Sequence, residues 1–410
     1  MSAPRSVVVV GAGLAGFSVG HALRRAGFRG PVTVLGAEPH PPYDRPPLSK
    51  GFLTGAVTAA GLHLDDPSAP LDVEWVPGAA AAGLTVDPAG WAVTTEDGRR
   101  CTAEAVVLAT GADAVALGPA VPGTHVLRTL ADAEALRADG VAGRDVLVIG
   151  FGFIGLESAA AAAALGAASV TVVAPEPVPL ADRLGAAVGD AVAGLHRRHG
   201  VVLRGGATVT TWEAGPDGRI RAVGIHDADG VHTLPTDLVI CGVGVRPATG
   251  WLADAVPAGL ALAPDGGVLC GPDGRTGIPG VWAVGDCARW THTERPGLRR
   301  AGHWQDCPDQ AAVVAAGLLG RTPPSLPQPY FWSDQFGVTL QLAGHLEGDE
   351  VAVVRAGSVE GADLLVGYER DGVEVALLGM DRPRDLVRWR RTRDPRRTPT
   401  TQLTGTGAPA

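Results

Sequence analysis

A chain of 410 residues is long for one domain, so we expect two or three domains. The composition, 46% hydrophobic and 19% charged, is that of a folded globular protein and excludes a largely disordered chain. A formal net charge of −9 argues against a general role on nucleic acids or anionic membranes. No apolar run is long enough for a transmembrane helix and the first residues lack the pattern of a signal peptide, so the expected location is the cytoplasm.

Residues 6–38 predict a strand, a tight turn, a helix and a second strand. In that setting G-x-G-x-x-G indicates a dinucleotide site. Gly11 permits the turn, Gly13 lets the backbone approach a pyrophosphate, and Gly16 permits close packing of helix on strand. The helix N-terminus adds unpaired N–H groups. Glu38, expected to close the second strand, is suited to accept hydrogen bonds from a ribose.

Residues 43–50 read YDRPPLSK and end on Lys50, the only lysine of the chain. An exposed surface could use arginine there, as the rest of the protein does. A compact ammonium with rotatable donors differs from the broad, planar guanidinium of arginine. The isolated lysine therefore favours a functional role over simple solvation.

Residues 103–112 predict a buried strand that ends in a tight turn. Residues 145–176 then repeat the first unit as DVLVIGFGFIGLES and SVTVVAPE, so a second dinucleotide site is expected. The glycines that repeat the three roles are Gly150, Gly152 and Gly155. Ala174 stands where an acid usually ends the second strand, and Glu176 lies two residues on. The choice between NADH and NADPH therefore stays open.

The remaining segments complete an α/β pattern. Residues 85–100 and 222–235 predict antiparallel hairpins with Asp-Gly turn signals. Residues 236–249 repeat the strand and turn of residues 103–112, and residues 277–289 predict a strand that delivers Asp286 at its end. From residue 329 onward, alternating strands and then a short helix are expected.

Cysteine and histidine spacing predicts neither a redox disulfide nor a metal site. The five cysteines lack a C-x-x-C or C-x4-C arrangement, and free buried thiols are expected; they are Cys101, Cys241, Cys270, Cys287 and Cys307. The histidines are scattered without metal-ligand spacing, so we predict no metal.

Several motifs together resemble the FAD-dependent ferredoxin reductases that serve oxygenase systems. They are GAGLAG, YDRPPLSK, ATGA, RTLADAEALR, GFGFIGLE, GVGVRPAT, VWAVGDCA and PYFWSDQFG, spread over residues 5–390. The resemblance implies an α/β fold with two Rossmann-like dinucleotide-binding domains, as in glutathione reductase, and a C-terminal α+β domain. The implied division is an FAD domain at 1–113 and 235–325, an NAD(P) domain at 114–234, a C-terminal domain at 326–397 and a flexible tail at 398–410.

This resemblance also implies the activity. Electrons would pass from NADH or NADPH to FAD and then singly to a [2Fe-2S] ferredoxin that feeds an oxygenase. The partners would be that ferredoxin and the nicotinamide nucleotide, with no nucleic acid and no membrane, and the protein would be a monomer or a homodimer.

Residue by residue, the resemblance assigns cofactor contacts to the motifs. Those expected at FAD or the nicotinamide nucleotide are Gly11, Gly13, Leu14, Ala15, Gly16, Glu38, Arg45, Lys50, Ala81, Thr110, Gly111, Arg128, Gly285, Asp286, Trp304, Trp332, Gly150, Gly152, Phe153, Ile154, Gly155, Glu157 and Gly244. Among them, Arg45 would lie on the adenine and phosphate side, Asp286 at the ribitol chain, and Trp304 and Trp332 around the isoalloxazine.

Lys50 and Glu157 are the residues that we predict to be catalytic. Lys50 would place positive charge at the flavin edge, which favours the reduced, more negative form electrostatically. Because a cation in a cleft is costly unless it is paired, Glu157 is the candidate counter-charge. An alternative for Glu157 is a helix N-terminal acid stabilised by the dipole alone.

Four positions depart from the family pattern: Asp113 (followed by Ala114 and Val115), Ala174, Val178 and Gly302. They motivate one alternative, a diverged FAD enzyme acting directly on a small organic substrate in a biosynthetic pathway. A second alternative is a flavin redox sensor or interaction protein, because the apoptosis-inducing-factor group shares the scaffold that this sequence resembles. Near residue 303, His303 has either an acid–base role or a packing role beside Trp304, and packing is favoured. The arginine-rich residues 382–397 either dock an acidic ferredoxin or form a solvated helix and tail.

Overall fold

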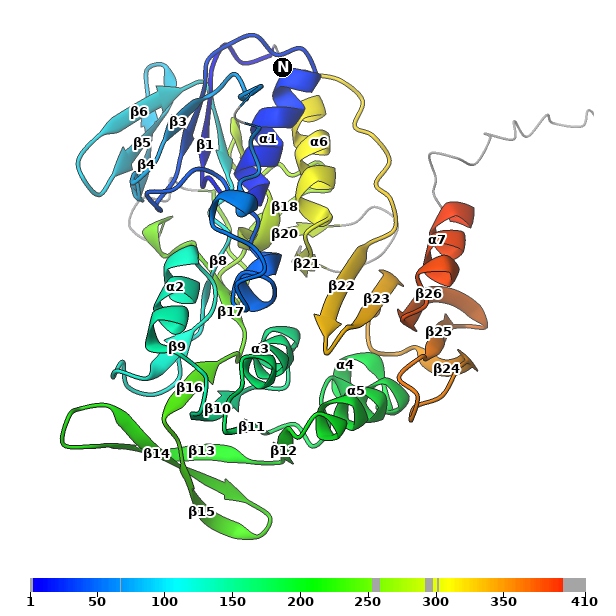
Figure 1. Ribbon diagram of the computed structural model, residues 1–410. Helices are drawn as coiled ribbons and strands as arrows, with labels where there is room; N and C mark the ends of the chain where they lie inside the picture. Colours follow the sequence, from blue (N-terminus) through cyan, green and yellow to red (C-terminus); the bar gives the residue numbers. More distant parts are fainter. Residues whose placement is uncertain (1–2, 67, 253–258, 292–297, 301, 394–410) are drawn as a thin grey trace, which may run out of the picture.

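The computed structural model describes residues 3–66, 68–252, 259–291, 298–300 and 302–393. Its parallel sheets carry helices, and a separate antiparallel sheet follows near the C-terminus (Figure 1). Residues 398–410, the expected flexible tail, lie outside the described residues. Within the described part of the chain, no helix is long and apolar enough to cross a membrane.

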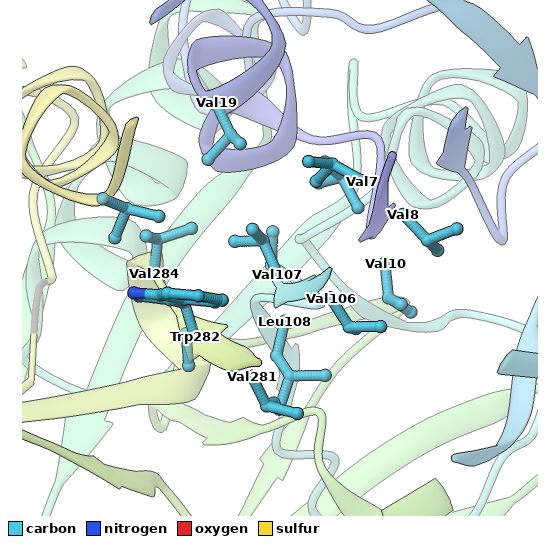
Figure 2. Packing of buried hydrophobic residues seen from close by; sticks show 14 of the residues in the cluster. Val7, Val8, Val10, Val19, Val106, Val107, Leu108, Val281, Trp282 and Val284 are labelled. Atoms are coloured by element: carbon cyan, nitrogen blue, oxygen red, sulfur yellow. The ribbon is translucent and has the colours of Figure 1, made fainter. Parts of the chain in front are cut away.

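The first parallel sheet is built around the run of valines at the start of the chain. Its strands, in spatial order, are β19 (Val281–Ala283), β7 (Ala105–Leu108), β1 (Val7–Val10), β2 (Val32–Leu35) and β3 (Glu74–Val76). Helices α1 (Leu14–Arg25) and α6 (Asp306–Leu318) lie side by side against it (Figure 1). Figure 2 shows Val19 of α1 above the side chains of β1, β7 and β19. Strands buried on both faces read as continuous apolar runs, as this one does.

A second parallel sheet repeats the plan. Its strands, in spatial order, are β12 (Val202–Gly205), β11 (Ser169–Ala174), β10 (Asp145–Ile149), β16 (Leu238–Cys241) and β9 (Thr124–Val126). Helix α3 (Phe153–Ala164) follows β10, as α1 follows β1, and α5 (Ala186–Arg198) precedes β12. Both β–turn–α–β units predicted from the sequence are therefore confirmed.

The predicted hairpins are each part of a three-stranded antiparallel sheet. The strands are β4 (Ala81–Asp87), β5 (Gly90–Thr95) and β6 (Arg100–Ala103) in one, and β13 (Thr208–Ala214), β14 (Ile220–Asp227) and β15 (Gly230–Pro235) in the other. Two small sheets complete this part: β8 (Ala112–Ala114) with β17 (Val245–Pro247), and β18 (Val268–Cys270), β20 (Ala288–Thr291) and β21 (Leu298–Arg300). The remaining helices of these regions are α2 (Leu130–Asp139), α4 (Ala181–Leu184) and the 3₁₀ turns η1 (Pro46–Ser49), η2 (Ala60–Leu62), η3 (Gly250–Leu252) and η4 (Gly285–Cys287).

The C-terminal sheet packs against the second parallel unit. Its strands, in spatial order, are β22 (Tyr330–Gln335), β23 (Val338–Gly344), β26 (Val373–Met380), β25 (Leu365–Arg370) and β24 (Val351–Ala356), and α7 (Pro383–Thr392) covers part of it. Leu156 of α3 and Val188 of α5 share one buried cluster with Phe331 and Leu340. Through this shared core, the start of β22 packs against the first turns of α3.

Two sequence expectations need adjustment. Strand β2 ends at Leu35, so Glu38 lies beyond it in the following turn and does not close the strand. Residues 235–325 were expected to return to the FAD domain, yet β16 pairs in parallel with β10 of the second sheet. The break in the sheets therefore follows Cys241, because β16 is the buried strand that completes the second sheet.

Candidate functional site

The first glycine loop connects β1 to α1 and leaves open space at its middle glycine. A Cβ built on Gly11, whose φ is +115°, would lie 2.2 Å from the Ala109 carbonyl oxygen, and one on Gly16 only 1.8 Å from the Gly11 oxygen. At Gly13 nothing lies closer than 4.0 Å. Gly11 and Gly16 are thus required by the fold itself, whereas Gly13 leaves a cradle open in front of the helix.

No side chain caps the N-terminus of α1, and its first turn carries no acid. The first N–H groups of a helix lack intrahelical partners and add partial positive charge. Leu14, Ala15 and the open position at Gly13 therefore present a backbone surface that fits a pyrophosphate.

The second loop, between β10 and α3, has the same geometry. A Cβ on Gly150 or Gly155 would lie 2.5 or 2.2 Å from a backbone oxygen, while Gly152 has nothing closer than 3.8 Å. Helix α3 likewise has no side-chain cap. Ile154 is 41% exposed in the first turn of the helix, so an apolar side chain borders this second cradle.

A polar network stands beside the first cradle. Glu38 accepts hydrogen bonds from Tyr43 Oη and Arg45 Nη2, both at 2.7 Å. Arg45 also donates to the Arg128 carbonyl oxygen at 2.7 Å, and its Nη2 is the atom nearest to the Cβ position of Gly13. Burial raises the pKa of Tyr43 far above its usual value, so the phenol remains a donor. Glu38 is thus fixed next to the cradle.

A second ion pair closes the other side of this cradle. Arg128 donates from Nη2 to Asp286 Oδ2 at 2.6 Å and from Nε to the Ala112 oxygen at 2.8 Å. A Cβ on Gly285 would lie 2.8 Å from Ala15 Cβ, so the turn that carries Asp286 approaches the start of α1 closely. Thr110 Oγ1 donates to the Ala248 oxygen at 2.7 Å.

Lys50 and Glu157 form the ion pair that the sequence predicted. Lys50 Nζ lies 2.7 Å from Glu157 Oε2, and the Glu157 side chain is only 3% exposed. Ser49 Oγ also donates to Oε2, and Ser333 Oγ donates to Oε1 at 2.6 Å. The carboxylate therefore meets three donors, so the helix dipole does not act on it alone. The catalytic role of the pair stays a prediction.

Aromatic side chains gather near this pair. Trp304 Nε1 donates to Asp44 Oδ1 at 2.7 Å, and the rings of Trp304 and Trp332 lie 6.4 Å apart, edge to face. Burial raises the pKa of Asp44. Trp332 comes from the C-terminal sheet, so β22 contributes directly to this cluster.

His303 packs beside the same cluster. Its ring stacks on Phe331 with centroids 4.6 Å apart, and Phe331 in turn lies 4.8 Å from Phe153. Burial lowers the pKa of His303 to about 4 and raises the pKa of Asp306 to about 6. A neutral, stacked imidazole at pH 7 supports the packing role over acid–base chemistry.

Two expected residues stand apart from these contacts. Ala81 begins β4 and packs against the core of the first sheet. Gly244 is exposed in the turn after β16, with φ +110° and nothing within 4 Å of its Cβ position.

The four departing positions have local explanations. Ala174 ends β11 with 1% exposure, while Glu176 is exposed in the next turn. Val178 packs where α5 has Gly189, whose Cβ position lies 3.0 Å from Val178 Cγ1. Gly302 is exposed and donates its N–H to Asp306, and Asp113 stands opposite an arginine in the β8–β17 pair.

The sequence did not single out four residues that complete the site: Tyr43, Asp44, Ser49 and Ser333. Each lies inside a motif already noted, YDRPPLSK or FWSDQ. No spacing rule distinguishes these polar groups from solvated ones. The hydrogen bonds that bring Asp44, Ser49 and Ser333 into the site join residues more than 100 positions apart in the chain, and Tyr43 meets the nearby Glu38 only through the fold of the loop between them.

The other sequence expectations concern thiols, metals and the arginines. The five cysteines are free, and four of them are buried. Across the described residues, no group of three or more His, Cys, Asp or Glu side chains could hold a metal ion. On α7, Arg384, Arg388 and Arg391 are exposed around Val387, and residues 394–397 lie outside the described part.

Comparison with known proteins finds similarity along almost the whole chain. The family model described as pyridine nucleotide-disulphide oxidoreductase matches residues 5–311, and the model described as reductase C-terminal matches residues 330–405. A ferredoxin–NAD(P)(+) reductase of Sphingomonas sp. is 35% identical over 94% of this chain and 92% of its own length. Putidaredoxin reductase of Pseudomonas putida is 34% identical over 93% and 90%.

Solved structures agree. The reductase in the crystal structure of the covalent putidaredoxin reductase–putidaredoxin complex superposes with a TM-score of 0.87, at 34% identity over 95% of this chain and 93% of that one. An NAD-dependent persulfide reductase from A. fulgidus, at 22% identity and a TM-score of 0.77, shares the fold. The family implies FAD and NAD(P)H as cofactors, and the two open glycine cradles fit two dinucleotides. The chain belongs to the pyridine nucleotide-disulphide oxidoreductase family and carries the reductase C-terminal domain.

Proposed function

We propose that this protein is a flavoprotein reductase that passes electrons from NADH or NADPH through FAD to a [2Fe-2S] ferredoxin serving an oxygenase. The observation that carries the proposal is the buried Lys50–Glu157 pair, because it joins the YDRPPLSK segment to the first turns of α3 behind the second glycine loop. Relatives with ferredoxin reductase names over almost the full chain support it.

The first cradle is the proposed FAD site. Gly13 and the start of α1 would face the pyrophosphate, and Glu38 would accept from the adenosine ribose. The further contacts proposed for FAD come from Gly11, Leu14, Ala15, Gly16, Arg45, Ala81, Thr110, Gly111, Arg128, Gly285, Asp286, Trp304 and Trp332. Bound FAD supplies the redox chemistry, accepting two electrons from a nicotinamide and releasing them singly.

The second cradle is the proposed nicotinamide nucleotide site. Gly152 and the start of α3 would face its pyrophosphate, and the apolar surface of Phe153 and Ile154 would border the nucleotide. The remaining residues proposed here are Gly150, Gly155 and Gly244.

The chain's own residues have distinct tasks in this proposal. Lys50 holds a positive charge at a fixed place, because Glu157 and the Pro46 carbonyl oxygen both accept from its ammonium. That charge would favour the reduced, negative form of a bound flavin electrostatically. Trp304 and Trp332 cover the site with apolar surface and exclude water, which strengthens the effect of the charge.

We further propose the domain division stated for the sequence, with the returning FAD segment starting after Cys241. One chain supplies every residue of both cradles, so a monomer suffices for activity, and a homodimer is compatible with it.

An anaerobic titration tests the function. The FAD-loaded protein is mixed with NADH and NADPH in turn, and the flavin absorbance is followed. We expect one nucleotide to bleach the flavin absorbance rapidly. We also expect cytochrome c to be reduced only after a [2Fe-2S] ferredoxin is added. Bleaching by a small organic substrate alone would overturn the proposal in favour of a diverged enzyme. A long-lived charge-transfer complex with slow bleaching would instead indicate a redox sensor.

A further inference from the structure

The buried carboxylate of Glu157 has its two oxygens satisfied from different parts of the molecule. Oε2 accepts from Lys50 Nζ and Ser49 Oγ, which both come from the segment around η1. Oε1 accepts from Ser333 Oγ at 2.6 Å, and Ser333 belongs to β22 of the C-terminal sheet. Three structural units therefore meet on one side chain.

Ser333 has a defined direction in this junction. Its side chain is 0% exposed, and its oxygen accepts a hydrogen bond from Gln335 Nε2 at 3.0 Å. Residues i and i+2 of a strand share one face, so Gln335 approaches from the same side of β22. Since the Gln335 amide supplies its own hydrogen, the single hydrogen of the Ser333 hydroxyl is directed to Glu157.

A buried charge needs this second oxygen to be satisfied. Leaving a buried acceptor without a donor costs ~1–3 kcal/mol, more when the group is charged. The ion pair with Lys50 satisfies Oε2 alone. Without Ser333, the Glu157 carboxylate could regain a hydrogen bond to Oε1 only by rotating or by admitting water. Either change would move the Lys50 ammonium that the carboxylate holds.

The neighbouring contacts fix β22 against α3. Phe331 lies 4.8 Å from Phe153, two residues before Ser333 on the same strand face. The Leu156 side chain, adjacent to Glu157, is buried in the cluster that includes Phe331. The hydroxyl is therefore held on a packed surface and is not on a mobile loop.

We propose that Ser333, oriented by Gln335, is a positioning residue that fixes the Glu157 carboxylate and through it the Lys50 ammonium. The C-terminal sheet would then do more than cover the flavin, because it would set the geometry of the charged pair at the flavin edge. The kinetic part rests on the proposed function, whereas the coupling between Ser333 and Glu157 does not.

The test compares Ser333→Ala with Thr339→Val in the FAD-loaded protein. Thr339 lies on the same hairpin and donates to Asp334 at 2.7 Å, so its variant is the matched control. In single-turnover reduction by NADH or NADPH, Ser333→Ala is expected to lower the limiting rate about tenfold, the effect of losing one hydrogen bond to a charged group. The apparent nucleotide dissociation constant should stay within about twofold, because the residue acts through Glu157 and not on the nucleotide.

Two further measurements separate positioning from general stability. In the Lys50→Met background, Ser333→Ala should slow reduction no further, because the ammonium that it positions is gone. In urea unfolding, the loss of midpoint caused by Ser333→Ala should be smaller in the Glu157→Gln background than in the natural sequence. The unfolding cycle needs no activity.

Each outcome decides a separate question. Ser333→Ala behaving like Thr339→Val, or effects that are additive in both cycles, would overturn the inference. If the natural protein is reduced by neither nucleotide, the proposed function fails, and the unfolding cycle still decides the coupling. Should Ser333→Ala not fold, Ser333→Cys replaces it, since a thiol of similar shape is a weak donor and should give a smaller loss of the same kind.

Discussion

The two glycine loops share a backbone but differ in what surrounds them. Both carry a middle glycine with open space and a helix without a side-chain cap. Beside the first loop, Glu38 is already held by two donors at 2.7 Å. Beside the second, the strand ends in buried Ala174, and the acid that follows two residues later, Glu176, is exposed. The same β–turn–α unit therefore has a polar acceptor fixed beside it at the first loop, and open, apolar surroundings at the second loop.

The helices differ at the equivalent position as well. Two residues after the third glycine stands Ser18 in α1 and Glu157 in α3. Ser18 is buried in α1, whereas Glu157 receives donors from two other units. This difference supports the proposal that the first loop retains FAD, because binding groups fixed in advance reduce the ordering cost. Beside the second loop, the acid that follows the strand is the exposed Glu176, and an acceptor that is not fixed in advance suits a nucleotide that must leave.

Removing Lys50 is expected to have the largest effect on the difference between the two loops. Lys50→Met is expected to retain FAD but to slow flavin reduction about 100-fold, the scale of losing one preorganised charge or donor. Stopped-flow absorbance at saturating nucleotide measures it. Lys50→Arg is the sharper control, since it preserves charge but not the compact ammonium, and it should also be slow. Unchanged reduction in Lys50→Met would remove Lys50 from the mechanism.

Breaking the first loop's network should loosen the resident cofactor. Glu38→Ala removes the acceptor shared by Tyr43 and Arg45 and is expected to weaken FAD binding about tenfold, in line with a charged hydrogen bond. Flavin fluorescence on dilution reports the released fraction. Glu176→Ala, the matched change in the second loop, should leave FAD retention unaltered; equal release from both variants would contradict the asymmetry.

The same Glu176→Ala variant tests the open question of the nucleotide. If Glu176 accepts from the adenosine ribose in place of Ala174, its removal should raise KM for NADH about threefold, the effect of one exposed hydrogen bond. KM for NADPH should not rise, because a 2′-phosphate gains from losing a nearby acid. Steady-state kinetics with both nucleotides gives the answer, and parallel changes in the two KM values would exclude Glu176 from the site.

The smallest effect expected is a pH-dependent change in stability at His303. Burial lowers the folded-state pKa of His303 to about 4, below its usual value near 6.5. Its contribution to stability is therefore present above pH 6.5 and is lost as pH falls from 6.5 towards 4. His303→Phe retains a ring against Phe331 without titrating, so its Tm should fall less between pH 7 and pH 4.5.

Asp306 has the opposite sign and serves as an internal check on this experiment. Its folded pKa is raised to about 6, so its contribution to stability is lost as pH rises from about 4 to 6. Asp306→Asn should therefore gain Tm relative to the natural protein as pH rises through that window. Identical pH profiles for all three proteins would show that neither group is buried in solution as it is in the structure.

Local sequence carried much of the fold. The valine run at residues 7–10, with glycines at positions 11, 13 and 16, specified strand, turn and helix, because the covalent spacing alone fixes which residues meet. The ion pair of Lys50 and Glu157 was predicted because the family resemblance placed Lys50 at the flavin edge, and a cation in a cleft needs a partner. The two hairpins were visible from their turns. Strand β13 of the second hairpin sheet was missed, although Asp217 and Gly218 form the same turn signal between β13 and β14.

The sequence by itself determined the two glycine loops between strand and helix and a separate C-terminal sheet, and with the family resemblance it predicted the pair of Lys50 and Glu157. Only the tertiary structure decided which other donors contact Glu157 and which polar groups lie beside each glycine cradle. Ser333 donates to a residue 176 positions away, and Arg128 pairs with one 158 positions away. Such contacts follow from how sheets pack on one another, and a hydroxyl or guanidinium in a motif carries no local mark of the partner that packing will bring to it.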